Sequence, residues 1–204
     1  MEECEERLDF TSRFWEYYRM LESDCLSLKR YINFQEENMS VSSDEIIKQI
    51  LSVSAEFDNV CREITGIRKE KPSIVDYGKW FFSEKYCVDL LGAKVKIRNT
   101  SIELTPFDGW GRTAKDRMAW WDAYNKIKHN RDKNYMLGNL GNLLKALSAL
   151  YYLEKEQYKI ISMRNSKDDC TVFDIPPDRS ELFEVAHDDS KYIHAGHDLY
   201  ALTN

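Results

Sequence analysis

The chain has 204 residues, 43% of them hydrophobic and 13% aromatic, with only 8 Gly and 4 Pro. This composition supports one sizeable apolar core and excludes a globally disordered chain and a turn-rich all-β fold. The net charge is −6, and it lies entirely in residues 165–204, which hold 9 acidic and 3 basic residues. Residues 1–164 are therefore neutral overall, and their charge does not favour nonspecific binding to nucleic acid.

The N-terminal part of the chain is expected to form two long helices. Apolar residues recur at alternating spacings of four and three across residues 8–32, which is the pattern of a packed helix. Ser42 and Glu45 match a capping box at the start of the second helix, because each side chain can pair with a free N–H of the first turn. Gly66 is expected to end that helix.

A third helix and a small β element follow. Ser73, with Asp76 three residues later, predicts the start of the third helix. In residues 93–104, hydrophobic and charged residues alternate on either side of a polar dipeptide, which predicts a short β-hairpin holding the only strands of the chain. Residues 105–111 form an aromatic loop, whose rings either stack nucleic-acid bases or, as we favour, pack onto the next helix.

Two more helices and an acidic tail complete the pattern. The fourth helix is expected to begin near Thr113 or Ala114, and the fifth to run from Leu140 to about Ile161 with leucines on its buried face. Residues 165–204 lose this periodicity and carry the excess acidic charge. They are therefore predicted to form an irregular or partly ordered tail that is dispensable for folding.

We therefore expect an all-α fold, a helical bundle of about five helices with a small β-hairpin insert. One domain spans residues 1–164, and an acidic, irregular C-terminal tail spans residues 165–204. The tail holds three histidines near aspartates: His187, His194 and His197. We favour solvated residues over a metal site there, since no scaffold is predicted for them.

The fourth helix presents two different faces. One is apolar on a helical wheel and is expected to dock onto the core: Trp120, Ala123, Tyr124 and Ile127. Asn125 and His129 lie four residues apart on another face, with Trp121 beside them. Several cations lie nearby: Arg117, Lys126, Lys128 and Arg131.

Such a cluster suits the cleavage of RNA. A histidine titrates near neutrality, so His129 can move the proton of a 2′-hydroxyl. Asn125 can orient the ring or the phosphate, and the cations can stabilise charge on the phosphoryl oxygens. Attack by a 2′-hydroxyl needs no metal ion. The other interpretation is structural, because a histidine near a helix C-terminus can cap carbonyls or interact favourably with the helix dipole.

The segment from Tyr124 to Arg131, with a Trp pair before it and a Leu-rich helix after it, resembles the signature helix of HEPN domains (higher eukaryotes and prokaryotes nucleotide-binding). The order of elements across residues 8–164 is also similar to that family. The resemblance implies a homodimer whose paired motif helices form one cleft. Many members are metal-independent endoribonucleases of bacterial toxin–antitoxin and phage-defence systems. The implied partners are RNA or a nucleotide, a second copy, and an antitoxin or defence-system protein, with no cofactor.

The resemblance also implies roles for individual residues. His129 would be the general base or acid, Asn125 the orienting group, and Arg131 a phosphate contact within the catalytic centre. Four residues would contact RNA or phosphate: Lys128, Lys126, Arg117 and Tyr124. Tyr124 stands where the family most often has Arg, which favours the alternative of a non-catalytic scaffold that binds nucleotide, RNA or protein. The surface position expected for the motif favours the ribonuclease.

Other sequence features indicate a cytoplasmic protein without a membrane segment, zinc site or cofactor. No apolar run approaches the ~20 residues of a membrane-spanning helix, and the acidic N-terminus is unlike a secretory signal. The five cysteines contain no CxxC pair, which is typical of reduced thiols in a cytosol. No P-loop, dinucleotide-binding or Ser-nucleophile motif occurs.

Overall fold

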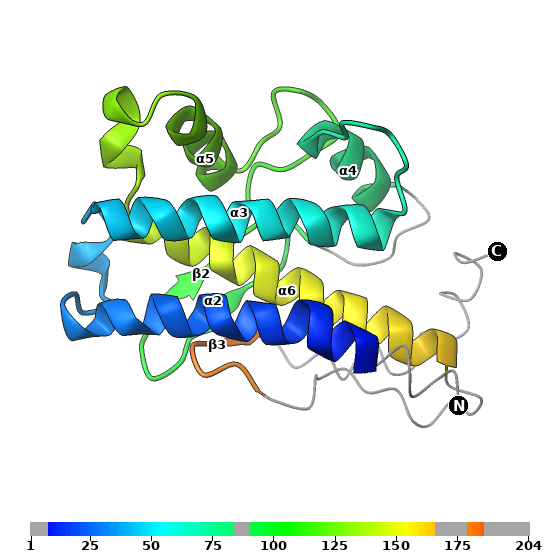
Figure 1. The fold of residues 1–204 in the computed structure, drawn as a ribbon, viewed down its shortest axis with the longest axis horizontal. Coiled ribbons are helices and arrows are strands. Elements are labelled where there is room, and N and C mark those ends of the chain that lie inside the picture. Colours follow the sequence, from blue (N-terminus) through cyan, green and yellow to red (C-terminus); the bar gives the residue numbers. More distant parts are fainter. Residues whose placement is uncertain (1–7, 84–89, 166–178, 186–204) are drawn as a thin grey trace.

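The computed structural model describes residues 8–83, 90–165 and 179–185, and these residues form a mostly helical fold with one small sheet. Three long helices make its centre: α2 (Glu16–Ser27), α3 (Asp44–Thr65) and α6 (Leu140–Asn165). In Figure 1, α6 runs diagonally between α2 and α3, and its contact with α3 is the most extensive between any two elements. The predicted fifth helix is α6, and its leucines are buried as expected.

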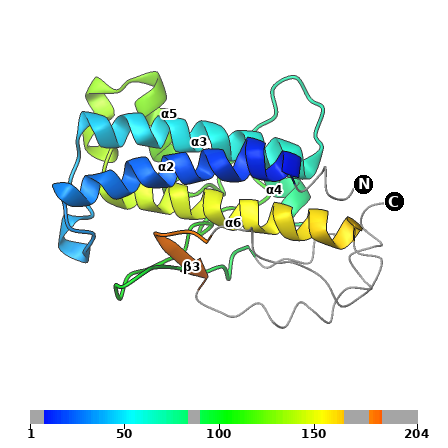
Figure 2. The same ribbon diagram turned by 60° about the horizontal axis from the view of Figure 1, so that its bottom comes forward.

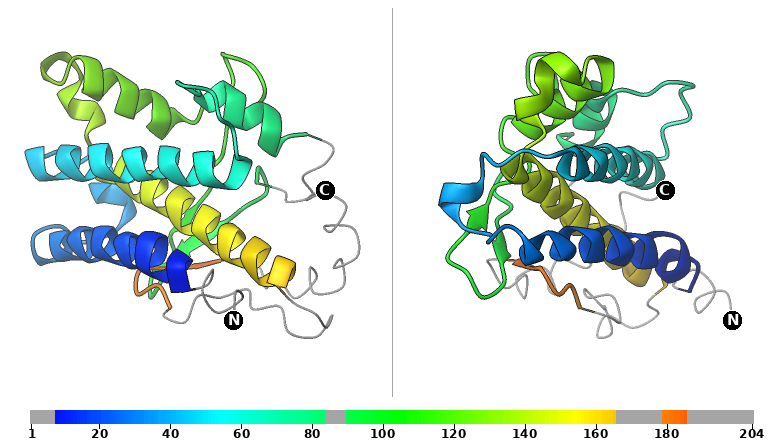
Figure 3. Two further views of the ribbon diagram at one scale, coloured as in Figure 1. Left: turned by 45° about the vertical axis from the view of Figure 1, so that its right-hand side comes forward. Right: turned by 60° about the vertical axis from the view of Figure 1, so that its left-hand side comes forward.

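The remaining elements cover the two sides of this centre. Two shorter helices, α4 (Ile74–Phe81) and α5 (Ala119–His129), lie on one side of α3. A small sheet lies on the other side, beside α2 and α6 (Figure 2, Figure 3). A mostly helical fold with a small β element is therefore confirmed.

The first helical segment follows the predicted span 8–32 closely. It comprises a π-helical turn, η1 (Thr11–Trp15), then α2, then a 3-10 turn, η2 (Leu28–Arg30). The predicted apolar stripe is buried in α2: Tyr18, Leu21 and Cys25. The long packed face is thus confirmed, with the helix ending just before the predicted limit.

The start of α3 differs by one position from the predicted capping box. Ser43, not Ser42, is the N-cap, and its hydroxyl accepts a hydrogen bond from the Ile46 N–H at 3.1 Å. The Ser42 hydroxyl instead donates to the Met136 carbonyl at 3.2 Å. Two adjacent serines are chemically equivalent as caps, so the tertiary contact of Ser42 decides which of them caps the helix.

Two other local signals are confirmed. Gly66 ends α3 with a φ of 62°, a left-handed conformation that favours glycine. Ser73 and Asp76 form a reciprocal capping box at the start of α4. The Asp76 carboxylate also pairs with Lys69 at 2.9 Å, and its hydrogen bonds with Lys69 and Ser73 lower its pKa to about 2.

The aromatic loop at residues 105–111 packs into the core. Trp110 is buried, and its indole N–H donates to the Ile74 carbonyl at 3.1 Å. The Trp110 ring centroid lies 5.9 Å from that of Phe57 in α3 and 5.3 Å from that of Phe81 in α4. The loop is therefore a packing element, and Trp110 is not available as a platform for nucleic-acid bases.

The sheet contains the predicted hairpin and one unpredicted strand. Strand β1 (Val95–Ile97) pairs antiparallel with β2 (Glu103–Leu104), as expected. A further strand, β3 (Phe183–Val185), pairs antiparallel with the other edge of β1, which gives the order β2-β1-β3. The prediction that residues 93–104 hold the only strands is therefore wrong. A strand this short within an acidic segment cannot display a readable two-residue alternation.

The chain before β3 is anchored to α2 by a buried carboxylate. Glu22 is 1% exposed and accepts hydrogen bonds from the Tyr18 hydroxyl at 2.8 Å and from the Leu182 N–H at 3.1 Å. Leu182 itself is fully buried. Residues 179–182 are irregular, as predicted for the tail, whereas the strand at 183–185 is regular structure that the prediction did not include. Their order comes from partners that are distant in sequence, which local periodicity does not reveal.

The cysteines of the described residues are core side chains. Cys25 and Cys61 are buried free thiols, and burial raises the pKa of each. The other three cysteines lie outside the described residues. Within the ranges that the structure describes, no helix combines the length and apolar character that crossing a membrane requires.

Candidate nucleic-acid interface

Helix α5, which carries the motif, begins later than the sequence predicts. Its first residue is Ala119, after an extended Met118, whereas the predicted start was Thr113 or Ala114. Residues 113–116 form a turn instead, in which the Thr113 N–H donates to the Asp116 carboxylate at 3.1 Å. Such a local bond between a short acidic side chain and the backbone competes with helix formation, and that explains the difference.

The predicted apolar face fixes α5 on the core. All four of its residues are buried: Trp120, Ala123, Tyr124 and Ile127. Trp121, expected beside the polar face, is buried as well, and its ring centroid lies 5.7 Å from that of Phe57 in α3. The Trp120 indole N–H donates to the Pro106 carbonyl at 2.7 Å. The polar residues of α5 are thus presented at the surface by a firmly packed helix.

His129 is the last residue of α5 and is exposed to solvent. Its imidazole has no hydrogen bond or ion pair with any other residue that the structure describes. The side chain of Asn134 caps this helix end, since its amide donates to the Lys126 carbonyl at 3.1 Å and to the Asn130 carbonyl at 2.7 Å. Among the described residues, the capping hydrogen bonds from a side chain at this helix end come from Asn134 and not from His129.

Asn125 makes no hydrogen bond with His129 among the described residues. It is partly buried, and its amide nitrogen donates to the Trp121 carbonyl one turn earlier at 2.9 Å. One of its two amide N–H donors is thus engaged with its own helix, which leaves the second N–H and the carbonyl oxygen for a ligand. Within one chain, the expected orienting contact between this amide and the imidazole is not formed among the described residues.

Tyr124 and Lys128 form a pair on the flank of the motif. The Lys128 ammonium donates to the Tyr124 hydroxyl at 3.2 Å and lies 5.3 Å from the centroid of its ring. The ring is buried while the ammonium end is at the surface. Tyr124 therefore holds the Lys128 ammonium in place at the surface.

Asp58 of α3 is a charged neighbour that the sequence did not single out. Burial raises its pKa, and the nearby cations Arg62 and Lys128 act in the opposite direction. Its carboxylate lies 3.7 Å from the Arg62 guanidinium. No sequence signal links Asp58 to the motif, because the two lie on different helices and meet only through the docking of α5 on α3.

The predicted cations are divided between the two ends of α5. Lys126, Lys128 and Arg131 lie with His129 at its C-terminal end, and all are exposed. Arg131 is within 3.7 Å of Asp132, an exposed pair of little energetic weight. Arg117 pairs instead with Asp122 in the first turn at 3.6 Å. The structure therefore gathers a histidine and three cations, and it leaves Arg117 apart from them.

In the described part of the chain, no group of three or more His, Cys, Asp or Glu side chains is arranged to hold a metal ion. The tail histidines His187, His194 and His197 lie outside the described residues.

The chain matches no protein-family model, and comparisons with curated proteins and with solved structures likewise find no match. Its function is therefore inferred from its own residues, chiefly those at the C-terminal end of α5.

Proposed function

We propose that the chain is an HEPN-like domain that binds RNA at the C-terminal end of α5 and cleaves it without a metal ion. One observation carries the proposal: His129 is exposed among cations and has no hydrogen bond among the described residues, while the side chain that does cap this helix end is that of Asn134. A free imidazole beside ammonium and guanidinium groups suits acid–base chemistry on a phosphodiester.

The proposed reaction is attack by the 2′-hydroxyl of RNA on the adjacent phosphate. His129 takes the proton of this hydroxyl, and the 2′-oxygen forms a bond to phosphorus. The bond to the 5′-oxygen breaks, and that oxygen receives a proton, which yields a 2′,3′-cyclic phosphate and a 5′-hydroxyl. Lys126, Lys128 and Arg131 stabilise the charge on the phosphoryl oxygens. The second proton-transfer group would be His129 of another copy.

The proposed active form is a homodimer in which two α5 ends face one cleft. Two features support it. The apolar face of α5 is already used against α3, so the face with His129 is the one left for a cleft. Met136, in the 3-10 helix η4 (Asp132–Leu137) directly after α5, is 67% exposed and offers an apolar contact to a second copy. Sedimentation of wild type and Met136→Lys tests this, since the substitution should shift a dimer toward monomer.

A second candidate function is RNA or protein binding without cleavage. Two observations favour it. Asn125 has one of its two amide N–H donors engaged with its own helix, and the buried Tyr124 stands where the family most often has Arg, so fewer groups are left to act on the phosphate. The cationic end of α5 would then serve as a binding surface within a defence or toxin–antitoxin complex.

The test is RNA cleavage in excess EDTA and RNA binding, measured side by side for the wild type and three variants. His129→Ala should lower cleavage by on the order of 10²-fold or more with binding retained. Lys126→Ala should weaken binding, and more so at low salt. Lys79→Ala is the matched control, because Lys79 is an exposed lysine on α4. Toxicity on expression would be scored for the same proteins.

The outcomes separate the two candidates. Cleavage that depends on His129 and leaves cyclic phosphate ends supports the ribonuclease. Binding without cleavage in the wild type supports the scaffold. Wild-type protein that neither binds nor cleaves RNA rules out both, and equal binding losses in Lys126→Ala and Lys79→Ala would show that the α5 end is not the interface.

A further inference from the structure

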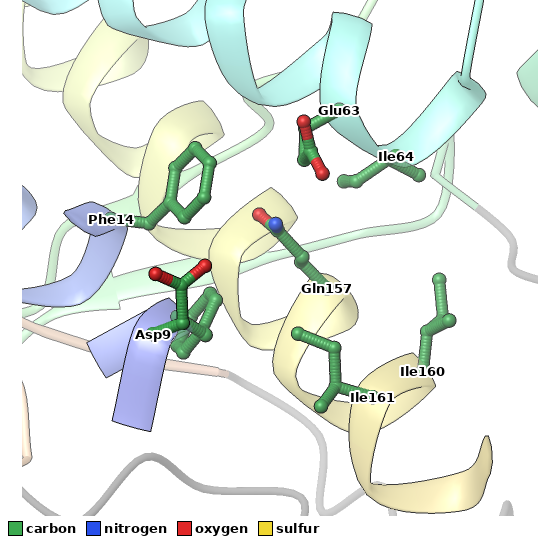
Figure 4. Close-up of a pocket in the computed structure, with 8 residues that line it drawn as sticks. Asp9, Phe14, Glu63, Ile64, Gln157, Ile160 and Ile161 are labelled. Atoms are coloured by element: carbon green, nitrogen blue, oxygen red, sulfur yellow. The ribbon is translucent and has the colours of Figure 1, made fainter. Parts of the chain in front are cut away.

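A small cavity lies at the far end of the bundle from His129. Its volume is about 150 Å³, it is partly open to solvent, and it is lined by the helical turns before α2, the last turn of α3 and the C-terminal part of α6 (Figure 4). The residues that line it are partly apolar and partly acidic: Asp9, Phe10, Phe14, Glu63, Ile64, Gln157, Ile160 and Ile161. A cavity of this volume has room for a molecule as large as benzene.

Gln157 gives the cavity an unmet hydrogen-bond acceptor. Its side chain is 6% exposed, and its Oε1 is buried without a hydrogen-bond partner among the described residues. Figure 4 shows the amide pointing from α6 into the space between Phe14 and Glu63. A buried carbonyl oxygen without a donor is unfavourable, so a ligand that brings a donor to this point gains from meeting it.

Two carboxylates make the same space negative. Asp9 and Glu63 both point toward it in Figure 4, from opposite sides. The Arg13 guanidinium donates to one oxygen of Asp9 at 3.1 Å, in a pair that is largely exposed. Glu63 has no ion pair with the residues that the structure describes. With one cation against two anions, the cavity mouth keeps a net negative charge.

We propose that this cavity binds a small primary amine with an apolar body about the size of a benzene ring. The ammonium group has three donors, which match the carboxylates of Asp9 and Glu63 and the oxygen of Gln157. The body would lie against the rings and isoleucines of the lining. The site does not depend on the proposed RNA chemistry, because Gln157 and the start of α6 near His129 are about 26 Å apart along the helix axis.

Benzylamine is the probe, and benzyl alcohol of nearly the same shape is its neutral counterpart. Binding to the full-length chain would be followed at neutral pH by amide chemical shifts. Benzylamine should saturate with a Kd on the order of 0.1–1 mM and perturb residues of the lining. Benzyl alcohol should bind about tenfold more weakly or worse, because it brings no charge.

Four variants locate the site. Gln157→Leu and Glu63→Gln should each weaken benzylamine binding by about tenfold, because each removes one partner of the ammonium. Ile160→Phe should abolish binding of both probes by filling the cavity. Glu37→Gln removes a carboxylate at the other end of the bundle and should leave binding unchanged.

Three results would overturn the proposal. Benzyl alcohol binding as tightly as benzylamine would show that the cavity recognises the apolar ring and not the ammonium group. Absence of saturable benzylamine binding would show that the cavity is not an amine site. Benzylamine affinity that is equal in the wild type, Gln157→Leu and Glu63→Gln, with each variant folded by its amide spectrum, would place the ligand elsewhere.

Discussion

Replacing Glu154 with Gln is expected to stabilise the fold at neutral pH and to flatten the pH dependence of its stability. Glu154 of α6 is fully buried, and neither carboxyl oxygen has a hydrogen-bond partner in the described part of the chain. Burial raises the pKa of this carboxyl well above its usual 4.5, and the nearby Glu56 of α3 raises it further. Burial also raises the pKa of Glu56, against the effect of its hydrogen bond with Asn59.

The sign of the effect follows from proton binding. In the unfolded chain Glu154 loses its proton near pH 4.5, whereas in the folded chain it keeps the proton to higher pH. Between these two pKa values the folded state binds more protons, so the free energy of unfolding falls as pH rises. One such group lowers it by up to about 1.4 kcal/mol per pH unit. The full stabilising contribution is present only below the unfolded pKa.

The assay is urea unfolding of wild type, Glu154→Gln and the exposed control Glu37→Gln between about pH 5 and 8. Gln keeps the shape of Glu but has no proton to lose. In Glu154→Gln, the free energy of unfolding should therefore change less with pH, by the contribution of one titrating group. Glu37→Gln should follow the wild type. If the free energies of unfolding of wild type and Glu154→Gln change with pH in parallel, Glu154 ionises in the folded protein at no cost, and burial does not raise its pKa.

Three further predictions concern the sheet and the motif helix. Glu22→Ala should cost about 2–5 kcal/mol in urea unfolding, because it leaves several buried donors without an acceptor. Removing residues 179–204 should lower the melting temperature in calorimetry by several degrees, as β3 and its buried side chains are lost; an unchanged value would show this strand to be dispensable. His129→Ala should stay within ~0.5 kcal/mol of the wild type, whereas Ile127→Ala, 2% exposed, should cost about 2–5 kcal/mol; the reverse order would mean that the histidine is structural.

Several features of this protein were determined by the sequence alone, and all of them are local. The apolar stripe of α2 follows from the spacing of its residues, because a helix brings side chains three and four positions apart onto one face. The capping box of Ser73 and Asp76 and the left-handed Gly66 depend on neighbouring backbone groups. The buried face of α5 could be predicted for the same reason.

The tertiary structure decided the features that depend on distant partners. Glu22 and Leu182 are 160 positions apart, and neither indicates the other in the sequence, yet their hydrogen bond anchors the chain that leads into β3. At the candidate site, the sequence placed His129 on an exposed face. Only the fold showed that Asn134 caps the helix and that the amide of Asn125 is engaged with Trp121. A side chain's hydrogen bonds depend on which groups folding brings within about 3 Å, and periodicity carries no information about that.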